Sequence, residues 1–286
     1  MAEASAHPVR RIDALKEIAR DYDAIVCDVW GVVHNGVSKF ASAEDALTSA
    51  RHDGVKVVLL TNSPRPHDGV IDQLDAMGFD RNAYDHVVTS GDATRDLIQK
   101  GEGAIFHLGP KRDLDVFKDL GVDLVPLEEA SRIVATGLFD DENETPDDYR
   151  DLLRDLRERE LTMICANPDI VVHRGERLIY CAGSIAREYG SLGGKVAFAG
   201  KPHRPIYELA RETMGLGEDA DAGILAIGDG MPTDIRGANA FGVDALFITR
   251  GIHGDELNAG DPSAESVTRL LDQNGLAARY FMPALK

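Results

Sequence analysis

Two short apolar runs that end in aspartate constrain the fold of this chain more than any other feature. Residues 24–27 lead directly into Asp28, and residues 224–228 lead into Asp229, which Asp234 follows five positions later. In an open α/β sheet, ligands bind where the parallel strands end, so acids at two strand ends can meet at one site. Carboxylates repel one another unless a cation lies between them. The pattern therefore predicts a Mg²⁺ site beside a nucleophilic aspartate.

Length and composition fit a globular protein with one or two domains. The chain has 286 residues, of which 43% are hydrophobic, enough for a buried core and too many for a disordered chain. No apolar run approaches about 18 residues and no apolar segment lies near the N-terminus, so we expect no membrane helix, no secretory signal and a cytoplasmic location. Cys27, Cys165 and Cys181 are expected to be buried thiols in a reducing compartment.

The formal net charge of −18 argues against two classes of partner. Nucleic-acid binding depends on Lys and Arg side chains that neutralise phosphates, and anionic membranes attract the same residues, so we expect no nucleic acid and no membrane partner. A small anionic substrate is still compatible with this charge, because a local cluster of cations and a bound metal can reverse the field within one cleft.

Apolar runs alternate with helical patterns along nearly the whole chain, which favours an α/β fold with a parallel sheet. Strands are predicted at residues 24–29, 55–60, 86–89, 196–199, 224–227 and 245–249, and helices at 8–20, 42–53, 68–77, 205–214 and 233–241. The middle third indicates a separate unit, with strands at 104–108, 132–137 and 162–166, helices at 112–120 and 146–159, and a hairpin at 170–181. We therefore predict a core domain formed by residues 1–90 and 190–286, with an α/β domain inserted at 91–189.

The acids at the strand ends have the side chains that phosphoryl transfer needs. Asp28 can attack phosphorus as a nucleophile. Asp229 and the backbone carbonyl of Trp30 can hold Mg²⁺ together with Asp28, because this hard cation prefers oxygen ligands. Asp234 can bind the metal directly or support its other ligands.

Two further elements can hold the transferred phosphoryl group. The Thr61 hydroxyl, with Asn62 and Ser63 at the start of a helix, can bind phosphate oxygens. Lys201 can balance the charge of the nucleophile and the phosphoryl group. Each element alone is more often a turn, a helix cap or a solvent-facing residue, but their joint occurrence in this order is much more specific.

These motifs resemble those of the haloacid dehalogenase (HAD) superfamily. They match its nucleophile loop at residues 28–32, its Thr at Thr61, its Lys at Lys201 and its acidic motif at 228–234. Thr-Asn-Ser at 61–63, Ala-Asn-Pro-Asp at 166–169 and Gly-Lys-Pro at 200–202 are similar to class IIA, the branch of the nucleotide- and sugar-phosphate phosphatases. The resemblance covers about residues 22–255. It implies a Rossmann-like parallel-sheet core with an inserted α/β cap domain.

The resemblance also implies an activity and its partners. It implies Mg²⁺-dependent hydrolysis of a small phosphorylated metabolite through an aspartyl-phosphate intermediate. In this class the loop at 166–169 and the segment near 181–183 face the active site, so Asn167 and Asp169 are implied substrate contacts, with an ordinary strand-to-turn connection as the alternative. Class IIA relatives often pair through their caps, which admits a homodimer.

Trp30 departs from the pattern of the resembling phosphatases. They carry a second Asp two residues after the nucleophile, which protonates the leaving group and then activates water. An indole can do neither. General acid–base catalysis is typically worth about 10²–10⁴-fold, so we expect slow hydrolysis of alkyl phosphates.

Several interpretations of Trp30 stay open at this stage. The substrate can carry a good leaving group, such as an acyl, aryl or anhydride phosphate. Another side chain can replace the acid, and His34 is the nearest candidate in the sequence. The chain can also be a phosphometabolite-binding protein with little turnover. Finally, haloacid dehalogenases carry an aromatic residue at this offset, but they do not rely on the metal acids, so Asp229 and Asp234 favour phosphorus over carbon.

Overall fold

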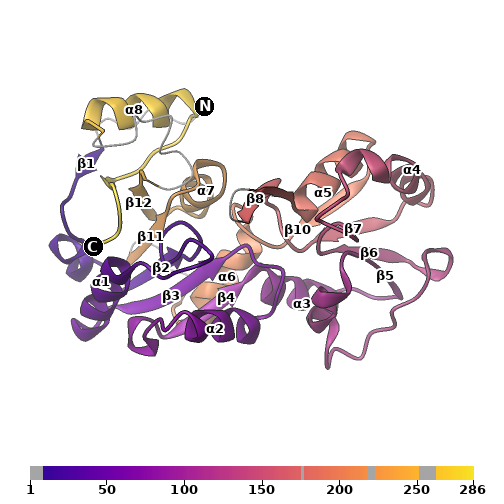
Figure 1. The fold of residues 1–286 in the computed structure, drawn as a ribbon, viewed down its shortest axis with the longest axis horizontal. Coiled ribbons are helices and arrows are strands. Elements are labelled where there is room, and N and C mark those ends of the chain that lie inside the picture. The colour runs from indigo at the N-terminus through magenta and orange to yellow at the C-terminus, as the bar shows by residue number, and fades with distance from the viewer. Residues whose placement is uncertain (1–8, 175–176, 218–222, 251–261) are drawn as a thin grey trace. The chain divides into compact units, whose positions relative to one another are not determined.

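The structure, a computed structural model, describes residues 9–174, 177–217, 223–250 and 262–286. The chain forms two compact units (Figure 1). The first unit contains Met1–Thr61, Ile71–Val87 and Tyr207–Lys286, and the second contains Asn62–Val70 and Val88–Ile206.

The first unit is built on a seven-stranded sheet with the strand order β1-β13-β12-β11-β2-β3-β4. Its pairs from β1 to β3 are all parallel. The strands are β1 (Arg10–Arg11), β2 (Ala24–Asp28), β3 (Lys56–Thr61), β4 (His86–Thr89), β11 (Ile224–Gly228), β12 (Asp244–Ile248) and β13 (Tyr280–Met282). β2 and β11 are neighbours and are buried along their whole length, which explains their continuous apolar sequences. The predicted α/β fold class is confirmed.

Helices follow the strands as expected for parallel α/β connections. They are α1 (Ala41–His52), α2 (His67–Ala76), α3 (Ser90–Lys100), α4 (Arg150–Glu158), α5 (Ala182–Ser191), α6 (Arg204–Thr213), α7 (Arg236–Phe241) and α8 (Ala264–Gln273). The structure adds α3, α5 and α8 to the predicted helices. A capping box starts α3: the Thr89 hydroxyl accepts from the Asp92 N–H at 2.9 Å, and the Asp92 carboxylate accepts from the Thr89 N–H at 3.0 Å.

The second unit contains a four-stranded parallel sheet with the order β10-β7-β6-β5. Its strands are β5 (Ile105–Leu108), β6 (Arg132–Ala135), β7 (Thr162–Cys165) and β10 (Lys195–Phe198). An antiparallel hairpin joins β8 (Val171–Arg174) to β9 (Arg177–Tyr180). One hydrophobic cluster packs this sheet against α4 and α5, and another packs it against α3.

Strand β10 corrects the predicted domain boundary. The sequence predicted that the core resumes at residue 190, but Lys195–Phe198 pairs with β7 in the second unit. The apolar sequence of this strand is compatible with pairing in either sheet, because the sequence does not show which strand is its partner. The division into residues 1–90, 91–189 and 190–286 otherwise stays a prediction.

Two predicted helices are wrong. Of the predicted helix 8–20, residue 8 lies outside the described residues, and residues 9–20 contain β1 and two single 3₁₀ turns, Leu15–Glu17 and Ala19–Asp21. The Glu17 carboxylate caps the first turn by accepting from the N–H groups of Asp13 and Ala14. Residues 112–120 form a 3₁₀ segment, Lys111–Phe117, and Asp119 then takes a positive φ of 59°.

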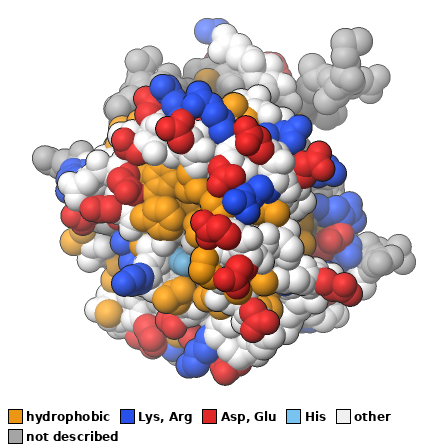
Figure 2. All heavy atoms as spheres, turned by 90° about the vertical axis from the view of Figure 1, so that its right-hand side faces the viewer, with side chains coloured by type: hydrophobic (Ala, Val, Ile, Leu, Met, Phe, Trp, Pro, Cys, Tyr) orange, Lys and Arg blue, Asp and Glu red, His pale blue; other side chains and the backbone are white. Residues whose placement is uncertain are grey.

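The surface mixes both signs of charge. Figure 2 shows acidic and basic side chains interspersed around a group of hydrophobic ones. Exposed pairs such as Arg81–Asp75 at 2.7 Å are typically worth less than about 1 kcal/mol, so the surface ion pairs do little to hold the fold. Among the residues that the structure describes, none of the helices is both long and apolar enough to cross a membrane.

The cap of α3 gives a test of local stability. Thr89 is fully buried, so Thr89→Val keeps its shape but leaves the start of α3 without its hydroxyl acceptor. We expect Thr89→Val to lower the free energy of unfolding by about 1 kcal/mol more than Thr89→Ser does. Urea unfolding followed by circular dichroism measures the difference. Equal stability of the two variants would show that the capping bond does not stabilise the fold.

Candidate functional site

Three carboxylates come together at the ends of neighbouring strands in the first unit. Asp28 is the last residue of β2, and Asp229 follows β11 directly, where Cys27 and Ile227 are paired in the register. Asp28, Asp229 and Asp234 each offer an oxygen, and these atoms lie within 4.8 Å of one another. The exposed fractions of the three residues are 8%, 7% and 5%. The strand-end argument therefore predicted their convergence, while their chemical roles stay predictions.

A single π-helical turn, Met231–Ile235, brings Asp234 back to the strand end. Its Oδ2 accepts from the Gly230 N–H at 2.9 Å, and its own N–H donates to the Gly230 carbonyl at 2.8 Å. A Cβ at Gly228 would overlap the side chain of Asp234. Glycine at position 228 is therefore what allows the two segments to approach so closely.

The loop after Asp28 packs its backbone directly against Asp229. Gly31 has a φ of +85°, and a Cβ there would overlap the Asp229 carboxylate. The turn is held by bonds from the Gly31 N–H to the His34 carbonyl and from the Val33 N–H to the Val29 carbonyl, both 2.8 Å long. The loop that follows β2 thus packs against Asp229 and restricts the position of its carboxylate.

The donor set fits a hard divalent cation. Three carboxylates this close and this buried strongly disfavour being ionised together without a compensating positive charge. Mg²⁺ and Ca²⁺ prefer carboxylate and carbonyl oxygens, whereas sites for softer metals use Cys or His ligands. All three side chains of the cluster offer only oxygen, so they match the predicted Mg²⁺ in type.

Trp30 and His34 form the rim of this loop. The indole of Trp30 is 39% exposed, while His34 is only 2% exposed. Their rings meet edge to face, with centroids 5.1 Å apart. The Nδ1 atom of His34 accepts from the Gly36 N–H at 2.9 Å, and burial lowers the pKa of His34 below its usual range. A buried, neutral imidazole that already accepts one bond is poorly placed to replace the missing acid.

The remaining predicted residues of the second unit are linked through Asn62. Its Nδ2 donates to Asp169 Oδ1 at 2.8 Å and to the Lys201 carbonyl at 3.1 Å, and its Oδ1 accepts from the Lys201 N–H at 2.7 Å. Asn167 in turn accepts from the Asp169 N–H through its Oδ1 at 3.0 Å. Lys201 itself is 3% exposed. The amide of Asn62 thus positions the Lys201 backbone and Asp169, a role that the sequence did not predict.

Thr61 and Ser63 flank Asn62 in the chain. Thr61 ends β3 and is 8% exposed, one position beyond Leu60, which pairs with Asp28 in the sheet. Ser63 is half-buried, and its hydroxyl accepts from the Arg65 N–H at 3.3 Å. Their predicted roles as phosphate ligands stay predictions.

A buried polar network at the ends of β5 and β6 was missed by the sequence. His107 Nε2 and Thr136 Oγ1 are 2.8 Å apart, and Thr136 also hydrogen-bonds the carboxylate of Asp113. Asp113 is 5% exposed, and burial raises its pKa. An isolated Asp in a polar stretch gives no signal of burial, so only the fold could reveal this network.

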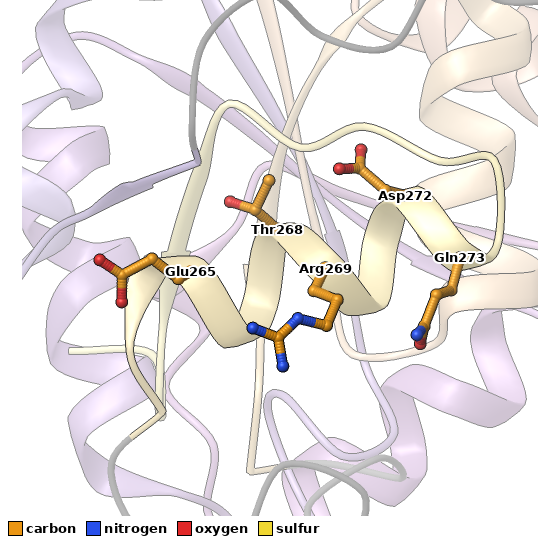
Figure 3. A pocket seen from close by; sticks show the side chains of 5 residues that line it. All are labelled: Glu265, Thr268, Arg269, Asp272 and Gln273. Carbon is orange, nitrogen blue, oxygen red and sulfur yellow. The ribbon is translucent and has the colours of Figure 1, made fainter.

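A pocket of about 580 Å³ lies along α8 and does not contain the acids. It is lined by Glu265, Thr268, Arg269, Asp272 and Gln273. Figure 3 shows Thr268 and Asp272 on one side of the helix and Arg269 and Gln273 on the other. Because these side chains do not converge on one point, we assign no function to this pocket.

Comparison with known proteins gives consistent matches. A family model described as haloacid dehalogenase-like hydrolase matches residues 25–123, and one described as HAD-hydrolase-like matches residues 198–273. A solved structure of a hydrolase of the haloacid dehalogenase-like family from Brucella suis 1330 is 50% identical, with a TM-score of 0.83. That match covers 96% of this chain and 100% of the other.

More distant relatives are phosphatases. A p-nitrophenyl phosphatase structure from Archaeoglobus fulgidus is 19% identical, covers 92% of this chain and 96% of the other, and shares the fold with a TM-score of 0.73. The D-glycerol 3-phosphate phosphatase of Mycobacterium tuberculosis (strain ATCC 25618 / H37Rv) is 28% identical over 250 residues, or 84% of this chain. The match spans 66% of that relative's length, slightly under two thirds.

The contact between Gly31 and Asp229 gives a test of the predicted metal site. Gly31→Ala must strain the backbone and displace the Asp229 carboxylate. Gly54→Ala is the matched control, because Gly54 also has a positive φ, +91°, but has open space around it. We expect both to lose about 1–2 kcal/mol from backbone strain, and only Gly31→Ala to abolish the rise in Tm that Mg²⁺ gives the wild type. A Mg²⁺-dependent Tm rise retained in Gly31→Ala would contradict the proposed site.

His107 gives a test of pH dependence. Burial lowers its pKa to about 4 from the ordinary 6.5. Between these values the unfolded chain binds a proton that the folded chain does not, so stability is lost as the pH falls through this window. His107→Gln should flatten this slope. Urea unfolding at several pH values measures the slopes, and parallel slopes for wild type and His107→Gln would refute the assignment.

Proposed function

The chain belongs to the haloacid dehalogenase-like hydrolase family, and on that premise we propose that it is a Mg²⁺-dependent phosphatase of small phosphorylated metabolites. The observation that carries the proposal is the cluster of three buried carboxylates at neighbouring strand ends, with one of them, Asp28, at the position of the family's nucleophile. Two relatives that are named phosphatases support the reaction type.

The metal would be held by Asp28, Asp229 and the backbone carbonyl of Trp30, with Asp234 as a direct or supporting ligand. When bound, it would neutralise charge on the acids and polarise the phosphoryl oxygens. The hydrogen bond from the Gly230 N–H to Asp234 Oδ2 fixes the orientation of that carboxylate. This favours Asp234 as a residue that holds the other metal ligands in place.

The chemistry would be carried by the chain's own residues. Asp28 attacks phosphorus, the bond to the leaving oxygen breaks, and an aspartyl-phosphate forms. Water then attacks the phosphorus, and the Asp28 carboxylate is regenerated as inorganic phosphate leaves. Lys201 would balance the charge on the phosphoryl group, and Thr61 would donate its hydroxyl to a phosphate oxygen.

The substrate would be selected by residues of the second unit, which we propose is the cap. Asn167 and Asp169 are the proposed contacts, and Asn62 and Ser63 would complete the phosphate site. The network from Asn62 to Asp169 supports this grouping, because one amide side chain holds Asp169 and the Lys201 backbone together. A homodimer through the cap stays part of the proposal.

Removal of the nucleophile tests the proposal. Asp28→Asn should lower the hydrolysis of p-nitrophenyl phosphate and acetyl phosphate by about a thousandfold or more, because the amide cannot attack phosphorus. Asp68→Asn, at a carboxylate that is 87% exposed, is the control and should leave the rate unchanged. A chelator should also abolish the wild-type activity, and Mg²⁺ should restore it.

A loss of activity in Asp28→Asn supports the proposal only if the variant is folded. Circular dichroism and Tm should show that Asp28→Asn is folded. Activity retained in this variant, or in metal-free wild type, would reject the proposed mechanism. Tight binding of phosphate esters without any turnover by the wild type would instead identify a binding protein.

A further inference from the structure

Trp30 presents a large aromatic surface on the loop that follows the proposed nucleophile. Its side chain is 39% exposed, although Val29, Val32 and Val33 around it are at most 2% exposed. It stands two residues after Asp28, on the same loop. An exposed indole among buried neighbours is available for contact with a ligand.

The indole is held in one orientation. A Cβ at Gly36 would overlap the six-membered ring of Trp30, so this ring packs closely against the glycine. The other contact is the edge-to-face packing against His34, with an angle of 76° between the rings. A bridge between the backbones of Trp30 and His34 closes the loop. A ring fixed in this way can serve as a stacking surface with little loss of freedom on binding.

The same loop provides no acid for the leaving group. The indole has only a very weakly acidic N–H, and His34 is 2% exposed. Without a proton donor from this loop, hydrolysis by Asp28 releases the leaving oxygen as an anion, which is fast only when that oxygen is weakly basic. Conjugated leaving groups, such as phenolates and enolates, meet this condition, and they are also planar.

We propose that Trp30 is a specificity residue that selects phosphate monoesters with a planar, conjugated leaving group, an aryl or enol phosphate, by stacking against it. This inference rests on the proposed phosphatase function. The proposed substrate class differs from the alkyl ester in the name of the M. tuberculosis relative. It is of the same type as the aryl ester in the name of the A. fulgidus relative.

The reaction balances without an enzymatic proton donor. A carboxylate oxygen of Asp28 forms a bond to phosphorus, and the ester P–O bond breaks with its electron pair going to the conjugated oxygen. That anion leaves and takes its proton from bulk water. In the second step a water oxygen bonds to phosphorus and gives up a proton to bulk solvent, while the pair in the Asp28–phosphorus bond returns to the carboxylate. Inorganic phosphate carries away the oxygen of the water.

Binding can be read directly because Trp30 is the only tryptophan in the chain. Phenylphosphonate and cyclohexylphosphonate are similar in size, are not hydrolysed and differ in their planar ring. With Mg²⁺ present, we expect phenylphosphonate to change the tryptophan emission of the wild type and to bind about three- to tenfold more tightly than cyclohexylphosphonate. Trp30→Leu should remove this preference, and Trp30→Phe should keep part of it. Equal affinities of the two phosphonates in the wild type would overturn the inference.

Kinetics separate stacking from leaving-group chemistry. Phenyl, cyclohexyl and acetyl phosphate combine a ring with a moderate leaving group, a ring with a poor one, and no ring with a good one. Wild type should hydrolyse phenyl phosphate at least about a hundredfold faster than cyclohexyl phosphate. Trp30→Asp should narrow this ratio by raising the cyclohexyl rate, and Trp30→Leu should raise KM for phenyl phosphate but not for acetyl phosphate.

Failure of the phosphatase proposal and failure of the proposed role of Trp30 give different results. No hydrolysis of any of the three phosphate compounds would reject the phosphatase proposal, while the phosphonate titration would still report on stacking at Trp30. Equal rates on phenyl and cyclohexyl phosphate, or a KM for phenyl phosphate that does not change in Trp30→Leu, would overturn the role of Trp30 and leave the phosphatase proposal standing.

Discussion

The close packing of three buried carboxylates is the constraint on which the rest of this structure depends. Asp28 and Asp229 reach one point because β2 and β11 are parallel neighbours, and Asp234 returns to it through a single π-helical turn. Such an arrangement opposes folding unless a cation compensates the charge. Glycine at positions 31 and 228 makes it sterically possible, because any side chain there would overlap one of the acids. The site thus depends on backbone shape as much as on acidic side chains.

Much of the fold could be predicted from the sequence because its signals are local. The buried strands β2 and β11 have continuous apolar sequences, and α1 and α2 begin and end close to their predicted bounds. The helix α3 was not predicted, although Thr89 and Asp92 have the spacing of a capping box. Partner choice was not readable: β10 has an ordinary strand sequence and pairs in the second unit rather than in the first.

The site could be predicted only in part, because some of its contacts join residues that are far apart in the sequence. The convergence of acids at strand ends could be expected in advance, since ligands of an open α/β sheet bind where the parallel strands end. The positioning role of Asn62 could not, because it depends on hydrogen bonds to Asp169 and Lys201, residues far away in the chain. Nor could the burial of His34, which the sequence left as a substitute acid and the structure shows at 2% exposure. That burial leaves Trp30 as the distinguishing feature of the loop.

If the three carboxylates form a metal site, Asp28 and Asp229 bind one divalent cation between them. A crystal structure grown with Mn²⁺ in place of Mg²⁺, with data collected for anomalous scattering, tests it most directly. We expect one strong anomalous peak within about 2–2.5 Å of carboxylate oxygens of both residues. A metal-saturated crystal with no peak there, or with the peak bound elsewhere, would contradict it.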